Sequence, residues 1–420
     1  MFFQTNWTDK LCPYLRKSGL VRQSSNVQRF IIELSRRRKD KIASLVGRNH
    51  GNVRGELDLI PSLVVVLPYC ALEEVARSPY VKKIWRDTPA YALLDVAIPT
   101  VGGAKARELG LTGKGITIAV IDTGIHPHRD FLYPTNRILA WRDLLNQKAQ
   151  PYDDNGHGTH VAGIIAGNGT VSRGKYRGMA PETQLVVLKA LDQDGAGAVS
   201  SIISGVEWLL QNSKKLKIHA LNLSLGTTAQ ESYKLDPLCR ATTSAWKNGI
   251  VVCAAAGNEG PEESTINSPG INPLTLTIGN MDDQQTLKPD DDKLSPTSSR
   301  GPTIDNLVKP DLLAPGTNIA STWKNGLYRS MTGTSMATPM VTGAVALIMQ
   351  KWPAATPNQV KKLLVKTSRS LGLSAVLQGA GALDLEKIFD KESPQTISAK
   401  SFHSFNFYQF ISRILSGSQN

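Results

Sequence analysis

Residues 115–124, GITIAVIDTG, form a mostly apolar run that ends in a carboxylate, Asp122. Three later runs share this character: TQLVVLKAL (183–191), KIHALNLSLG (217–226) and GIVVCAAAGN (249–258). Stretches of helical texture separate the runs. Strands that are apolar on both faces and alternate with helices are typical of a parallel sheet covered on both sides. We therefore predict an α/β domain over residues 91–390, with a doubly wound, mainly parallel sheet and helices on both faces.

The sequence on either side of this domain has a different texture. Residues 1–90 are basic and suggest short elements: a helix over 26–46, a strand over 62–68 and further elements within 71–85. This pattern predicts a small α+β domain in front of the large one. Residues 391–420 are rich in Ser, Phe and Gln and are interpreted as a C-terminal extension.

Composition narrows the possible function classes. The chain has 420 residues, of which 41% are hydrophobic and 20% charged, as is ordinary for a globular protein. The net charge is +13, and the runs at 35–41 and 81–86 are strongly basic. Such runs bind nucleic acid or form a solvated face. No aromatic stacking pattern accompanies them, so we expect the solvated face and no nucleic-acid partner.

The cysteines and apolar segments carry further expectations. Four scattered cysteines form neither a metal-type pair nor a disulfide framework, and Cys253 is interpreted as a small buried hydrophobe. The N-terminus lacks a continuous apolar signal core, and the most apolar stretch, 59–72, is too short to span a bilayer and holds two prolines. We expect no membrane association and a cytoplasmic location, with release by a non-classical route as the alternative.

Candidate functional residues follow the apolar runs. In an open, doubly covered sheet, ligands bind beyond the carboxyl ends of the strands. Asp122, Ser224–Gly226 and Gly257–Asn258 stand at three such ends. Ser335 opens an apolar helix within MTGTSMATP (331–339), between small residues that let another chain approach. Asp122 taken alone could cap a helix, and Ser335 could be only an N-cap.

Two histidines, His157 and His160, lie three residues apart in NGHGTHVAG (155–163). A zinc site would require HExxH on a helix or a third ligand at a recognisable spacing, and the sequence has neither. Asp122, His157 and Ser335 together supply the parts of nucleophilic acyl transfer. A serine hydroxyl needs a base to accept its proton, and a buried carboxylate orients the imidazole that acts as that base.

Five motifs occur in a family-specific order: AVIDTGI (119–125), NGHGTHVAG, LNLSLG (221–226), AAAGNEG (254–260) and GTSMATP (333–339). With these motifs, residues 105–390 resemble the subtilisin-like serine proteases, or subtilases. Among them, the chain most resembles bacterial members made without a Sec signal. The resemblance implies a serine endopeptidase that requires no cofactor for its chemistry and acts on proteins or peptides. An esterase or a non-catalytic binding protein is the alternative.

The resemblance also assigns roles to residues. Asp122 matches the triad aspartate, His157 the general base and Ser335 the nucleophile, while His160 matches a supporting position. Asn258 matches the side chain that stabilises the oxyanion together with the Ser335 backbone N–H. A turn asparagine is the alternative for Asn258.

Substrate-binding positions follow in the same way. Ser224, Leu225 and Gly226 match a strand edge that pairs with extended substrate. One wall of the S1 pocket is matched by Ala255, Ala256 and Gly257, and Asn267 falls near the pocket floor. The polar side chain of Asn267 leaves the P1 preference open.

A calcium site at Asp130 is a further expectation from the resemblance. Asp130 matches a calcium-binding position of many subtilases, but the partner loop, 167–178, carries lysine and arginine and no acid. Because calcium needs several oxygen ligands, structural calcium stays open.

Residues 1–90 match an inhibitory chaperone pro-domain, which the enzyme cuts off between Thr88 and Leu94. The chain would then be made as a zymogen with its own leader as inhibitor. A permanent accessory domain is the alternative.

Overall fold

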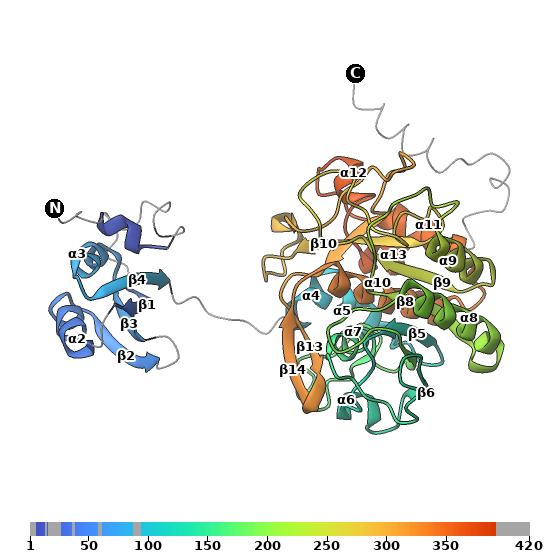
Figure 1. Ribbon diagram of the computed structural model, residues 1–420, viewed down its shortest axis with the longest axis horizontal. Coiled ribbons are helices and arrows are strands. Elements are labelled where there is room, and N and C mark those ends of the chain that lie inside the picture. The colour runs from blue at the N-terminus through green and yellow to red at the C-terminus, as the bar shows by residue number, and fades with distance from the viewer. Residues whose placement is uncertain are drawn as a thin grey trace, which may run out of the picture. The chain divides into compact units, whose positions relative to one another are not determined.

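The computed structural model describes residues 6–12, 15, 27–35, 38–57, 61–86 and 94–391 (Figure 1). The chain divides into two compact units, residues 1–91 and 92–420. The division falls one residue beyond the end of the predicted leader. The proposed cleavage segment and the C-terminal extension fall almost entirely outside the described residues.

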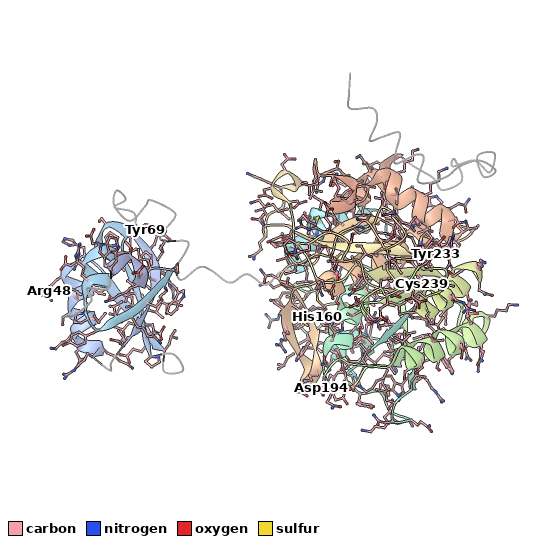
Figure 2. All side chains as sticks on the ribbon, turned by 45° about the horizontal axis from the view of Figure 1, so that its top comes forward. Arg48, Tyr69, His160, Asp194, Tyr233 and Cys239 are labelled. Carbon is pink, nitrogen blue, oxygen red and sulfur yellow. The ribbon has the colours of Figure 1, made fainter. Side chains whose placement is uncertain are left out.

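The N-terminal unit is a four-stranded antiparallel sheet with helices packed on it. The strand order is β2-β3-β1-β4. The described elements are η1 (Trp7–Lys10), β1 (Val27–Leu34), α2 (Lys39–Arg48), β2 (Asn52–Leu57), β3 (Ser62–Pro68), η3 (Tyr69–Ala71), α3 (Leu72–Arg77) and β4 (Val81–Arg86). Figure 2 labels Arg48 at the end of α2 and Tyr69, which directly follows β3. An α+β unit with a strand at 62–68 was predicted, and both features are found.

The helix predicted over 26–46 is wrong in its first half. Residues 27–34 form β1, and only Lys39–Arg48 is helical. Buried Phe30, Ile32 and Leu34 alternate with more exposed neighbours, a period of two that places one face of the strand on the core. These side chains are buried only once β1 lies in the sheet and α2 and α3 cover that face, because residues of both helices share their hydrophobic cluster.

The second unit is built on an eight-stranded sheet, in the order β11-β10-β9-β8-β5-β7-β6 with β12 beside β10. All pairs are parallel except β10 with β11. The strands are β5 (Thr117–Asp122), β6 (Ile138–Asp143), β7 (Gln184–Lys189), β8 (Ile218–Leu223), β9 (Val251–Ala255), β10 (Leu276–Asp282), β11 (Lys293–Leu294) and β12 (Leu312–Pro315). A separate hairpin pairs β13 (Ile319–Trp323) with β14 (Leu327–Met331). The prediction of a mainly parallel sheet is confirmed, and all four apolar runs contain its central strands.

Helices cover both faces of this sheet (Figure 1). Helices α7 and α10 pack on each other and on the central strands, while α8 and α9 form a second packed pair. The helices are α4 (Leu94–Thr100), α5 (Gly103–Glu108), α6 (Arg129–Leu132), α7 (His157–Ala166), α8 (Val199–Leu216), α9 (Pro237–Lys247), α10 (Thr334–Lys351), α11 (Pro357–Thr367), α12 (Ala375–Gln378) and α13 (Leu385–Lys391). Within the described residues, no helix has the length and apolar character needed to cross a membrane.

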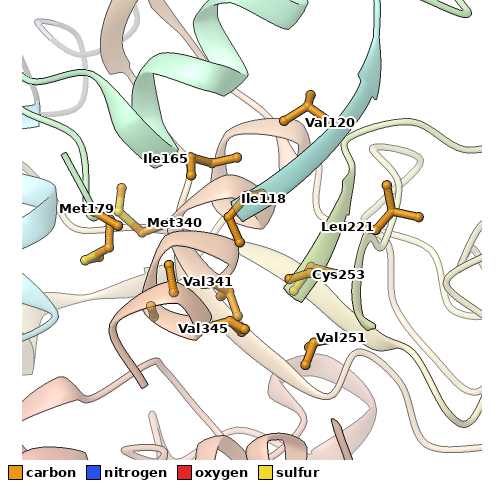
Figure 3. Packing of buried hydrophobic residues seen from close by; sticks show 14 of the residues in the cluster. Ile118, Val120, Ile165, Met179, Leu221, Val251, Cys253, Met340, Val341 and Val345 are labelled. Carbon is orange, nitrogen blue, oxygen red and sulfur yellow. The ribbon is translucent and has the colours of Figure 1, made fainter. Parts of the chain in front are cut away.

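The core fixes α10 against the sheet. Figure 3 shows Val341 and Val345 of α10 gathered with Ile118 of β5 and Cys253 of β9, and all four side chains are fully buried. Cys253 is thus the buried hydrophobe that the sequence predicted, and burial raises the pKa of its thiol to about 12. Because α10 carries Ser335 at its N-terminus, this packing holds that serine at a fixed place beside the sheet.

Candidate active site

Asp122 is the last residue of β5, a strand buried along its whole length. Its side chain has no solvent exposure, and Oδ1 accepts a hydrogen bond from Thr123 N at 2.7 Å. The same Oδ1 lies 2.7 Å from His157 Nδ1. An ionised carboxylate is an acceptor only, so Nδ1 carries the proton in this pair and Nε2 keeps its lone pair.

His157 is the first residue of α7, and glycines on both sides let the helix begin there. Gly156 has a φ of 112°, which a residue with a side chain rarely adopts. A Cβ on Gly158 would lie 2.3 Å from the Gly124 carbonyl oxygen, so only glycine lets the helix approach the end of β5 this closely.

The pKa of His157 reflects two opposing effects. Burial by itself lowers it, but the charge and hydrogen bond of Asp122, with the charge of Asp153 adding to them, hold the pKa of His157 above its ordinary value. The protein environment therefore favours the imidazolium form. A histidine that acts as a base becomes an imidazolium when it accepts a proton, so this environment stabilises the product of that step.

His160 has a different environment. It is fully buried inside the second unit, where Figure 2 labels it. Its Nε2 donates to the carbonyl oxygens of Ile319 and Arg329, both at 2.9 Å, so it ties α7 to the β13–β14 hairpin. Burial lowers the pKa of His160 to about 3, which keeps the ring neutral. The residue thus has a supporting position.

Ser335 is the second residue of α10 and lies half-buried beside the end of β8. Its hydroxyl donates to the Ser224 carbonyl oxygen at 3.1 Å, and the Ser224 hydroxyl donates to the Ser335 carbonyl oxygen at 2.9 Å. His157, Ser335 and Ser224 line one cleft of about 560 Å³. In the described structure the Ser335 hydroxyl is thus directed at Ser224 rather than at His157.

Asn258 projects from the turn after β9 and is exposed. Its Oδ1 accepts from Thr334 N at 2.9 Å and from Thr334 Oγ1 at 3.2 Å. These bonds cross to the start of α10 and do not cap the backbone of the turn itself. With Oδ1 held, Nδ2 is oriented and has no acceptor among the described residues. The amide is therefore available as a donor next to Ser335.

The predicted substrate-binding residues lie around the same cleft. Ser224 is buried, whereas Leu225 and Gly226 are more exposed and their backbone groups make no hydrogen bond to the described residues. Thr227 resumes pairing with Ser268. Leu225 and Gly226, which follow β8 and precede the Thr227 bridge, therefore have backbone donors and acceptors that no described residue occupies.

Asn267 lies between Gly226 and the buried segment Ala255–Gly257. The Asn267 backbone N–H donates to the Ala256 carbonyl oxygen at 2.8 Å. On the other side, a Cβ added to Gly226 would lie 3.0 Å from the Cβ of Asn267. Its Nδ2 donates to both carboxylate oxygens of Glu259, at 3.0 and 3.1 Å. The sequence singled out Asn267 but not Glu259, which fixes the orientation of the amide.

Asp130 does not present its carboxylate to a cation. It is fully buried, and Oδ1 accepts from Val171 N at 2.9 Å. Oδ2 accepts from Gly169 N at 3.2 Å and from Tyr328 Oη at 2.7 Å. Calcium binds where several oxygen ligands converge, whereas hydrogen-bond donors surround this carboxylate. The residues at Asp130 therefore do not fit a calcium ion.

The guanidinium of Arg137 supplies a positive charge beside Asp130. Arg137 is almost fully buried and donates to the backbone carbonyl oxygens of Asp130, Ala166 and Thr183. In the part of the chain that the structure describes, no group of three or more His, Cys, Asp or Glu side chains is arranged to hold a metal ion.

Two polar residues that the sequence reasoning missed connect the site. The Thr123 hydroxyl accepts from Gly158 N at 2.8 Å and donates to Asp153 Oδ1 at 2.9 Å. Asp153 is buried and belongs to the acidic pair before NGHGTH. That pair was the available signal, but nothing in the sequence indicates which of the two carboxylates points inward.

Comparison with known proteins identifies the family. A model described as "Subtilase family" matches residues 113–382. The chain belongs to the subtilase family. This subtilase is 43% identical over 328 residues to the serine protease AprX of Bacillus subtilis (strain 168), covering 73% of this chain and 74% of that protein. It is 37% identical over 290 residues to subtilisin BL of Lederbergia lenta, covering 69% and 96%.

A solved structure gives the same result. The crystal structure of a cold-adapted subtilisin-like serine proteinase matches this subtilase with a TM-score of 0.54 and 34% identity, covering 65% of this chain and 90% of that one. This subtilase is a serine-type endopeptidase that hydrolyses peptide bonds in protein substrates. The esterase and the non-catalytic binding protein are set aside.

Proposed function

We propose that Asp122, His157 and Ser335 form the catalytic triad of this peptidase. The observation that carries the proposal is the 2.7 Å contact of His157 Nδ1 with Asp122 Oδ1 at one side of the cleft that His157 and Ser335 line. For reaction, the Ser335 hydroxyl leaves the Ser224 carbonyl and turns its proton towards His157 Nε2. Catalytic hydrogen bonds are often long or absent before substrate binds.

The reaction then takes two steps. Ser335 Oγ attacks the carbonyl carbon of the scissile bond while its proton passes to His157 Nε2. Asp122 stabilises the imidazolium, which gives the proton to the leaving amine as the C–N bond breaks. Water attacks the acyl-enzyme with His157 again as the base, and the carboxylic acid leaves as Ser335 regains its proton.

Asn258 Nδ2 and the Ser335 backbone N–H are proposed to stabilise the oxyanion. The N–H of Ser335 lies in the first turn of α10 and has no acceptor among the described residues. The anchored Oδ1 of Asn258 leaves only its amide nitrogen to point away from Thr334. Donors fixed before the reaction stabilise the developing charge without reorganisation.

Extended substrate is proposed to pair with the free edge at Leu225 and Gly226. The P1 side chain would enter between this edge and the wall formed by Ala255–Gly257, with Asn267 at its floor. Backbone pairing of this kind gives affinity that does not depend on side-chain sequence. It therefore suits a peptidase with more than one protein substrate.

Kinetics of single and double variants test the triad. Ser335→Ala and His157→Ala should each lower kcat by about 10⁶, the loss measured in subtilisin, a member of this family. Because the residues act as a unit, the double variant should lose no more than either single one. Ser330→Ala, at an exposed serine of β14, is the matched control and should keep wild-type kcat. Additive losses in the double variant would contradict the triad.

The leader, residues 1–90, is proposed to be removed by the enzyme's own active site and to inhibit it beforehand. Ser335→Ala should accumulate as the full 45.6 kDa chain, while the wild type loses the leader. Intact-mass spectrometry of both purified proteins, before and after incubation, measures this. Trimming of Ser335→Ala at the wild-type rate, with no other protease present, would refute self-processing.

A further inference from the structure

Asp153 gathers five hydrogen bonds although it lies outside the proposed triad. Its Oδ1 accepts from Thr123 Oγ1 at 2.9 Å, Asn155 N at 3.2 Å and Gly156 N at 2.7 Å. Its Oδ2 accepts from Thr159 N at 2.9 Å and Thr159 Oγ1 at 2.6 Å. Asp153 as a whole residue is 7% exposed. Such a buried carboxylate is well compensated only while all of these donors stay in place.

These bonds connect two different elements. Thr123 directly follows Asp122 at the end of β5, whereas Gly156 and Thr159 flank His157 at the start of α7. The Thr123 hydroxyl extends the connection, because it also accepts from Gly158 N at 2.8 Å.

The backbone adds a further tie, since Gly124 and Asp153 form an antiparallel bridge and Ile125 N donates to the Tyr152 carbonyl oxygen at 3.1 Å. The Asp153 carboxylate thus lies at the junction between the strand of Asp122 and the helix of His157.

We propose that Asp153 is a positioning residue for peptide hydrolysis, which fixes the spacing and orientation of the His157 imidazole relative to the Asp122 carboxylate. The proposal rests on the roles given above to Asp122 and His157. Asp153 touches neither the substrate nor Ser335 and acts only through the triad. In metal sites, residues that orient a ligating histidine from behind typically change activity by roughly 10- to 100-fold, and we expect a loss of that order here.

The charge of Asp153 gives the experiment a second readout, the pKa of His157, beside kcat. Asp122 from β5 and Asp153 from the preceding loop both raise the pKa of His157 against the lowering effect of its burial. His160, on the same helix, stays neutral because burial lowers its pKa. Among the described residues, neighbouring segments also carry His126, Asp154, Lys189, Asp194, Lys324 and Arg329. Removing the Asp153 charge should therefore lower the pKa of His157.

Asp143 offers a matched control. It ends β6, is 2% exposed, and accepts from the backbone N–H groups of Leu145, Asn146 and Lys148 and from Tyr152 Oη. It is thus a buried aspartate with a similar set of donors, but none of its bonds reaches α7. Asp143→Asn should cost stability in the same way without touching the triad.

The experiment compares Asp153→Asn, Asp143→Asn and Thr123→Val by the pH profile of kcat/KM, with kcat per site titrated by a fluorophosphonate. Asp153→Asn should lower kcat by about 10-fold or more with little change in KM, and its acid limb should move to lower pH. Thr123→Val cuts the connection but keeps the charge of Asp153, so kcat should fall while the acid limb moves less than in Asp153→Asn. Asp143→Asn should lower only the melting temperature.

Two results would overturn the positioning role. One is an Asp153→Asn enzyme whose kcat and acid limb match those of Asp143→Asn. If Asp153→Asn does not fold, Thr123→Val decides, and a kcat within about threefold of the wild type overturns the proposal. Titration of the wild type separates this from the proposed function. An unlabelled Ser335 refutes both, whereas a labelled Ser335 with unaffected variants refutes the positioning role alone.

Discussion

Gly158→Ala should slow catalysis although alanine favours helices. Gly158 is the second residue of α7, and in an unconstrained helix the change would stabilise by about 1 kcal/mol. Here the new Cβ would lie 2.3 Å from the Gly124 carbonyl oxygen and 3.1 Å from Asp122 Cβ. Overpacking of this kind typically costs about 1–3 kcal/mol, so the free energy of unfolding should decrease.

The displacement gives the size of the catalytic effect. Ordinary van der Waals contact begins at 3.4 Å, so the start of α7 has to retreat from β5 by about 1 Å. His157 is the neighbouring residue, and its 2.7 Å contact with Asp122 is stretched by the same movement. A misplacement of about 1 Å can cost roughly 10²-fold in rate. We therefore expect kcat to fall by about 10²-fold with KM nearly unchanged.

The assay is hydrolysis of a peptide amide, with kcat expressed per fluorophosphonate-titrated site and the melting temperature measured in parallel. Gly343→Ala is the matched control. Gly343 also lies on α10, but about two turns away from Ser335, and a Cβ there would lie 2.5 Å from Met179 Cβ. It should lower the melting temperature and keep kcat. A Gly158→Ala enzyme with kcat within about threefold of the wild type would refute the reasoning.

Three further predictions follow from the site. Asn258→Ala should lower kcat by roughly 10²–10³ with little change in KM, the figure for the equivalent donor in subtilisin, and a kcat within about threefold would remove it from the mechanism. The neutral form of His157 is the base, and the pKa of His157 is raised above 6.5. The value of kcat/KM should therefore fall as the pH drops through that raised pKa. An acid limb of the pH profile centred below 6.5 would contradict the assignment. Asp130→Ala should lower the melting temperature, and added calcium should stabilise it as much as the wild type; a gain confined to the wild type would place calcium at Asp130.

The sequence predicted the central sheet and the residues at its carboxyl edge well. Strands buried on both faces, such as β5 and β9, are continuous apolar runs that need no tertiary information to recognise. Asp122 ends β5 and Asn258 follows β9 after two residues, while His157 and Ser335 stand in short glycine-containing motifs. These residues lie in one region because parallel strands and their following helices bring the strand ends together.

Features that depend on distant partners could not be predicted. Val27–Leu34 was assigned to a helix because its alternation corresponds to burial only when β1 lies in the sheet and α2 and α3 cover one face. Asp153 and Asp154 are adjacent and chemically identical, yet one turns inward to α7 and the other pairs with Lys189. Asp130 matches a cation ligand by position, but its donors come from Gly169, Val171 and Tyr328, whose approach no local pattern indicates. The cellular location stays a prediction.

Labelling by a fluorophosphonate, mapped by peptide mass spectrometry, tests the central claim most directly. The reagent bonds only to a serine whose proton a base removes, so the wild type should carry one label, on Ser335. His157→Ala should carry none, because no other described group beside Ser335 is proposed to accept its proton. A label on another serine with Ser335 unmodified, or equal labelling of Ser335 in His157→Ala, would contradict the account.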